Sequence, residues 1–232
     1  MQLKLTEPID WANNAGYEVI DINDGYRENI KLVFSPYPAF QVGNIEIAST
    51  AYKNPIYIKA KNVKIVVINN DQNESTHNYK YFLISSNNDL LIDDQINRKH
   101  WLKYFNVFNE IDGKKIDFDL NNISIKHKIK NEDELIFVGG HAHFGHWLVD
   151  HLPIILFVEK NNLKKNNFKY LTSKLDQFQI ESLKTSGLNI NLLQIDIGKN
   201  YIGLISVPEI HILSDLSIYK SFELLRSYLS YS

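Results

Sequence analysis

Four of the eight histidines of this chain lie between residues 141 and 151, in a segment that also carries an aspartate. His146 and Asp150 are four residues apart, so a helix would place them on one face and in contact. A carboxylate that accepts a hydrogen bond from one imidazole nitrogen fixes the tautomer, and the other nitrogen can then exchange a proton near neutral pH. The pair predicts acid–base chemistry, with either Asp150 or His146 as the base. A purely structural hydrogen bond is the alternative.

The same histidines also raise the question of a metal site. His141, His143 and His146 match the His-x-His-x-Asp-His order of metallo-β-lactamase-like hydrolases, except that Gly145 stands where the aspartate belongs. Because that aspartate is itself a metal ligand, its loss removes much of the case for zinc or iron. We therefore expect no metal and no cofactor, and a metal-dependent hydrolase is the less favoured alternative.

The elements around this cluster suit a site at the end of a strand. Residues 135–138 are an apolar run typical of a buried strand, two glycines follow, and residues 144–161 have the pattern of a helix. Side chains and free backbone N–H groups converge where a strand ends and a helix begins. Pro153 lacks a backbone donor, so we expect it to bend this helix or to loosen its hydrogen-bond ladder near Val149.

Strands and helices alternate from Glu134 onward. Strands are predicted at residues 134–138, 168–171, 191–197 and 202–207, and helices at 144–161, 177–186 and 218–229. Gly187 stands where a left-handed cap would end the second helix. This alternation predicts a Rossmann-like βαβ layer with a largely parallel sheet over residues 131–232.

Residues 1–130 form a β-rich N-terminal region by the same reasoning. Short β-branched and aromatic runs occur at residues 30–34, 44–47, 56–59, 63–68, 79–84 and 90–92, separated by turn residues. They predict an antiparallel meander. The expected fold class is therefore α/β, with a β-rich meander followed by the Rossmann-like layer.

Composition excludes several classes of protein. No apolar run approaches the roughly 20 residues that a membrane-spanning helix needs, and the first residues do not form a secretory signal. The chain has no cysteine, which excludes disulfides, thiolate nucleophiles and cysteine-ligated zinc. A net charge of −2 gives no general attraction to nucleic acid. We expect a cytoplasmic protein without a nucleic-acid partner.

The segment from Phe144 to Pro153 resembles the His-Trp-Leu-x-Glu/Asp-x-Leu-Pro helix of glycosyltransferase family 61, which includes many bacterial capsular polysaccharide biosynthesis proteins. The matching residues are His146, Trp147, Leu148, Asp150, Leu152 and Pro153. The order of segments from residue 134 to the end is also similar to that family. Ile154 departs from the arginine that often follows the proline, so an anion contact from that position is not expected.

The resemblance implies an inverting glycosyltransferase of the GT-B type that transfers a sugar from a nucleotide-activated donor to a saccharide hydroxyl in surface or capsular polysaccharide synthesis. Asp150 and His146 would be catalytic, and Trp147 would pack or form a sugar platform. His143 and Gly140 flank the motif and are added as substrate-binding candidates. No metal would be required.

The resemblance also predicts the partners and the extent of the chain. A saccharide acceptor, a nucleotide-sugar donor and a polysaccharide assembly complex, bound peripherally, are the expected partners. The nucleotide-sugar lobe of the family would follow residue 232, so we expect the N-terminal lobe of a truncated enzyme. A non-catalytic remnant that binds a saccharide or a partner chain is the alternative.

Overall fold

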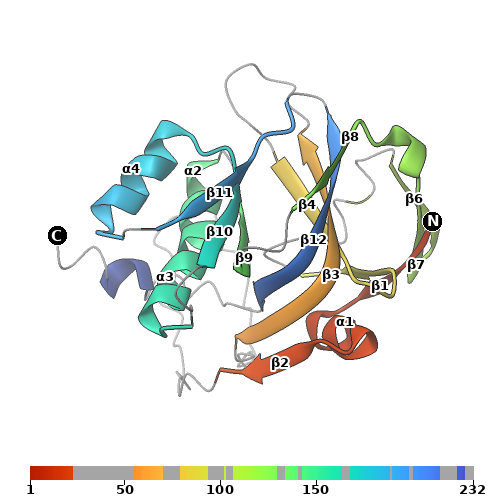
Figure 1. Cartoon of the computed structure of the whole chain (residues 1–232), viewed down its shortest axis with the longest axis horizontal. Coiled ribbons are helices and arrows are strands. Elements are labelled where there is room, and N and C mark those ends of the chain that lie inside the picture. Colours follow the sequence, from red (N-terminus) through yellow and green to blue (C-terminus); the bar gives the residue numbers. More distant parts are fainter. Residues whose placement is uncertain are drawn as a thin grey trace, which may run out of the picture.

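One mixed sheet organises the chain (Figure 1). In the computed structural model, the described residues are 1–22, 55–69, 79–93, 102, 107–129, 134–140, 143–163, 168–188, 190–198, 201–214 and 224–227. Their strands are β1 (Gln2–Thr6), β2 (Glu18–Asp21), β3 (Ile56–Asn69), β4 (Tyr79–Ile84), β5 (Asp89–Leu91), β6 (Phe108–Asp112), β7 (Lys115–Phe118), β8 (Ile125–Lys128), β9 (Glu134–Gly139), β10 (Phe168–Ser173), β11 (Leu192–Ile195) and β12 (Ile202–Ser214). The sheet order is β11-β10-β9-β12-β3-β4-β5-β1-β7-β6, and β2 and β8 pair with β3 and β12 outside this path.

Helices are a minor part of the described chain. They are α1 (Pro8–Ala15), α2 (Phe144–His146), α3 (Leu152–Lys160) and α4 (Gln177–Thr185), with a 3₁₀ turn η3 (Leu120–Asn122), a π-helical turn η4 (Trp147–His151) and a short helical segment at residues 224–227. Figure 1 shows α2, α3 and α4 gathered beside β9, β10 and β11. Among the described helices, none has both the length and the apolar character to cross a bilayer.

The predicted Rossmann-like βαβ layer, and with it the likeness to a GT-B N-terminal lobe, is wrong. Strands β9, β10 and β11 are parallel, but they belong to a large mixed sheet and do not form a layer of their own. Strand β12 pairs with β9 on one side and runs antiparallel to β3 on the other, which joins the C-terminal strands to the N-terminal ones.

The unexpected length of β12 is the physical reason for this error. The sequence predicted a strand that stops at Val207, because Pro208 and Glu209 interrupt the apolar pattern. In the structure, β8 pairs with β12 at residues 203–206 and β9 pairs with it at residues 210–212. Pro208 lies between these two partners, where the strand does not need its missing N–H group. The strand therefore continues to Ser214.

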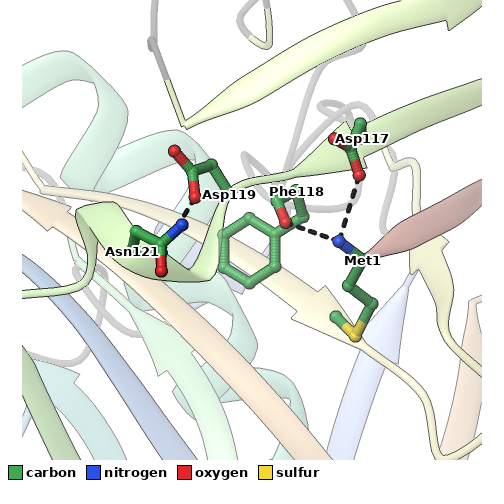
Figure 2. Close-up of polar contacts among 5 residues, drawn as sticks. All are labelled: Met1, Asp117, Phe118, Asp119 and Asn121. Atoms are coloured by element: carbon green, nitrogen blue, oxygen red, sulfur yellow. Dashed lines mark hydrogen bonds and ion pairs between the residues drawn. The ribbon is translucent and has the colours of Figure 1, made fainter.

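The N-terminal region contains the predicted antiparallel meander and, in addition, a strand that pairs with it in parallel. Strands β3, β4 and β5 are consecutive antiparallel neighbours, whereas β1 adds to β5 in parallel. Figure 2 shows how β1 is held against β7: the amine of Met1 donates to Asp117 Oδ1 at 3.0 Å and to the carbonyl oxygen of Phe118 at 2.9 Å. Asp119 then accepts from the backbone N–H of Asn121 and begins η3. The predicted strands at 30–34 and 44–47 lie outside the described residues.

The sheet curves around an apolar core. Two strands lie between β4 and β9, so a flat sheet would place these strands about 14 Å apart. Even so, the rings of Tyr81 on β4 and Phe137 on β9 meet edge to face with centroids 5.4 Å apart. A second core lies on the other face of β9 and β10, where α3 buries every residue from Leu152 to Val158. This face positions the helical segment that carries the histidines.

Candidate functional site

Two glycines end β9 and allow the neighbouring strand to come close. Gly139 and Gly140 have φ of +74° and +147°, a region that L-residues with a side chain rarely adopt. A Cβ atom on Gly140 would collide with the Oγ of Ser173, which ends the parallel strand β10. Gly140, predicted to bind substrate, is buried, and its need for glycine follows from packing against Ser173.

A π-helical turn interrupts the helix that follows these glycines. Helix α2, the turn η4 and helix α3 are continuous, and η4 comes directly before Leu152 and Pro153. Proline lacks the N–H group that would bond to Val149 in a regular α-helix, so the ladder widens at this point. The loosened ladder predicted near Val149 is confirmed. Single π turns inside helices occur frequently at functional sites.

This turn carries the predicted His/Asp pair. His146 Nδ1 lies 2.7 Å from Asp150 Oδ2. The side chain of Asp150 is 16% exposed, and that of His146 is 41% exposed. Asp150 therefore lies behind the imidazole, which faces the solvent. The ring of His143, on the exposed residue just before α2, meets the His146 ring edge to face with centroids 5.5 Å apart.

Trp147 lies inside the protein and cannot serve as an open sugar platform. Its side chain is fully buried, and its Nε1 donates to Ser182 Oγ of α4 at 2.7 Å. Ser182 in turn donates to the carbonyl oxygen of Gln179. The substrate-binding role predicted for Trp147 is therefore corrected: the residue attaches the π turn to α4. Sequence reasoning did not identify Ser182, because the contact joins residues 35 positions apart.

Phe144, two residues before His146 in the chain, is an exposed aromatic residue. Its side chain is 60% exposed, and its ring lies against Phe178 of α4 with centroids 5.7 Å apart. Phe144 precedes Trp147 by three residues, a spacing that would place both on one apolar stripe of an ordinary helix. The sequence thus gave no signal that Phe144 would be exposed and Trp147 buried.

His151 holds the π turn to the end of β9. Its Nδ1 donates to the carbonyl oxygen of Val138 at 2.8 Å, and its ring stacks on Trp147 with centroids 6.3 Å apart. Burial lowers the pKa of His151 to about 4, and the charges of His146 and Lys80 act in the same direction. The Val138 carbonyl and the charge of Asp150 oppose this effect without cancelling it. His151 is therefore a neutral, structural histidine near pH 7.

Acidification should destabilise the protein through His151. Because the folded-state pKa of about 4 is below the ordinary 6.5, the unfolded chain binds more protons between these values, and the free energy of unfolding falls as pH falls from 6.5 to 4. The loss is at most about 3 kcal/mol, since one pKa unit corresponds to about 1.36 kcal/mol. Urea unfolding at several pH values measures it.

His151→Asn is the matched variant for this measurement. The asparagine amide can keep the hydrogen bond to Val138 but does not titrate. We expect the variant to lose less stability than the wild type between pH 6.5 and pH 4. Parallel losses in the two proteins would mean that other groups cause the acid sensitivity.

The structure describes two of the three histidines that were considered as metal ligands. His143 and His146 are neighbours, whereas His141 lies outside the described residues. A different group of potential ligands, Glu134, Glu209 and His211, lies at the start of β9 and on β12. It is separate from the dyad, which follows the end of β9.

No protein-family model, curated protein or solved structure matches this chain. The resemblance to glycosyltransferase family 61 therefore depends on the motif residues themselves.

Proposed function

We propose that the dyad of His146 and Asp150 activates a saccharide hydroxyl for transfer of a sugar from a nucleotide-activated donor. The observation that carries this proposal is the 2.7 Å contact between an exposed imidazole and a less exposed carboxylate. A base in this position can remove the proton of an acceptor hydroxyl as its oxygen attacks the anomeric carbon of the donor. The nucleotide then leaves from the opposite face of the sugar, with inversion.

The geometry favours His146 as the base and Asp150 as the residue that orients it. Asp150 Oδ2 accepts the Nδ1 proton, which leaves the lone pair of a neutral imidazole on Nε2. Asp150 is the less exposed member of the pair, so an acceptor from solvent meets the imidazole first. A carboxylate in this position also stabilises the imidazolium that forms after proton transfer.

An exposed aromatic ring close to the dyad in the chain supports a sugar acceptor. Phe144 exposes an aromatic ring one residue after His143, and the apolar face of a sugar ring can pack on such a surface. The resemblance of residues 144–153 to the glycosyltransferase family 61 helix supports the same reaction class. A nucleotide-sugar donor, a saccharide acceptor, a cytoplasmic location and association with a polysaccharide assembly complex belong to the same proposal.

Nucleotide release from a panel of nucleotide sugars tests this function. The purified chain is incubated with each donor, with and without oligosaccharide acceptors, and free nucleotide is measured. We expect release that is specific for a donor and stimulated by an acceptor. Saccharide binding is measured in parallel by calorimetry. Binding without nucleotide release would favour the non-catalytic binding protein, and neither binding nor release would refute the proposal.

A further inference from the structure

Three potential metal ligands meet on adjacent parallel strands far from the dyad. They are Glu134 at the start of β9 and Glu209 and His211 on β12, and their ligand atoms all lie within 4.8 Å of one another. Pairing of β12 with β9 places His211 opposite Ile136. Since side chains alternate along a strand, all three residues project from the same face of the sheet.

His211 is held in place by the packing around it. Its side chain is 6% exposed, and its ring contacts the rings of Tyr57 and Phe168, with centroid distances of 5.3 Å and 4.8 Å. Glu134 and Glu209 are only partly buried. A buried imidazole beside two partly exposed carboxylates forms a site that is fixed on one side and open to ions from solvent on the other.

The hydroxyl of Tyr57 is a second observation at the same place. The residue is 3% exposed, and this hydroxyl has no hydrogen-bond partner within the described part of the chain. The ring of this tyrosine lies beside the ring of His211, with centroids 5.3 Å apart. A buried hydroxyl without a partner is costly, and a water bound to a metal ion would provide one.

We infer that Glu134, Glu209 and His211 bind one divalent cation of the Zn²⁺ class, with water completing the coordination. One imidazole and two carboxylates suit Zn²⁺, whereas Ca²⁺ and Mg²⁺ prefer more oxygen ligands. Ligands of one Zn²⁺ lie about 3 to 4 Å apart. We expect metal binding to rotate the two partly buried glutamate side chains and bring the ligand atoms, now within 4.8 Å of one another, to that separation. The ion links β9 to β12.

Replacing Lys59 distinguishes a metal site from a simple network of ion pairs. Its Nζ lies 2.9 Å from Glu209 Oε1, and residue 59 pairs with His211 across β3 and β12. Without a cation, Lys59 neutralises Glu209; a bound cation displaces it. Removing the lysine charge should therefore strengthen metal binding, whereas it would only disrupt an ion-pair network.

Calorimetric titration of the chelator-treated chain, without an affinity tag, with ZnCl₂ tests the site. We expect one Zn²⁺ per chain and a melting temperature raised by roughly 5 to 10 °C at a hundredfold excess over Kd. Glu134→Gln, Glu209→Gln and His211→Gln should each weaken binding by about tenfold or more. Lys59→Met should bind Zn²⁺ more tightly than the wild type.

His146→Ala is the control that separates this site from the histidine segment, and it should bind Zn²⁺ as the wild type does. Glu134 is partly exposed, so Glu134→Gln tests the site even if His211→Gln does not fold. Three results would each overturn the inference: no stoichiometric Zn²⁺ binding by the wild type, unchanged affinity in both glutamate variants, or loss of binding in His146→Ala.

Discussion

Under the proposed function, replacement of His146 by alanine is expected to lower the rate of sugar transfer by about 100- to 10,000-fold, the contribution of a well-placed general base. The alanine removes the imidazole that contacts Asp150 and faces solvent. Because His146 is partly exposed, the variant should keep the fold and the melting temperature of the wild type. Initial rates of nucleotide release, measured with the donor and acceptor that the wild type uses, give the effect.

Two further variants make this result specific. Asp150→Asn removes the charge that orients His146 and should lower the rate by about 100-fold or more. His127→Ala, which changes an exposed histidine on β8, should leave the rate unchanged. If both His146→Ala and Asp150→Asn keep rates within a few-fold of the wild type, the pair has a structural role and the proposed function is wrong.

Local features of the structure could be predicted from the sequence because they depend on neighbouring residues. The contact between His146 and Asp150 follows from a spacing of four residues, and the π turn follows from the missing N–H group of Pro153. Strand β4 has the predicted bounds, and the start of α4 at Gln177 is also as predicted. Gly187, with φ of +68°, adopts the predicted left-handed conformation.

One local element was missed although its signals were present. Helix α1 has Pro8 in its first turn and Gly16 in the left-handed conformation at its end, the usual boundaries of a short helix. It is only eight residues long, too short for its apolar period to stand out against the strand-like residues around it. Trp11 and Ala12 bury its inner face.

Pairing between distant strands could not be predicted in the same way. The antiparallel pairing of β12 with β3 brings Ile202 opposite Ile68 and Ser214 opposite Ile56, and no local pattern encodes such a register. The cluster of Glu134, Glu209 and His211 depends on another long-range pairing, that of β12 with β9. The alternation of strands and helices therefore predicted the C-terminal strands, but it indicated a largely parallel sheet where the structure has a mixed one.

Replacement of Trp147 by alanine is expected to destabilise the protein by about 3 to 5 kcal/mol, the usual cost of truncating a fully buried tryptophan. The change removes a side chain that is 0% exposed, the ring that stacks on His151 and the N–H group that donates to Ser182. A domain is stable by only about 5 to 15 kcal/mol, so this loss is a large part of the total. Urea unfolding monitored by circular dichroism measures it.

Two variants separate packing from the hydrogen bond. Trp147→Phe keeps an aromatic ring but not the N–H donor, and should cost about 1 to 2 kcal/mol. Ser182→Ala leaves the indole N–H group buried without its acceptor and should cost about 1 to 3 kcal/mol. Because Trp147 follows His146 directly in the chain and its indole attaches η4 to α4, we expect Trp147→Ala to disturb the dyad as well. A loss below about 1 kcal/mol would contradict the buried position assigned to this residue.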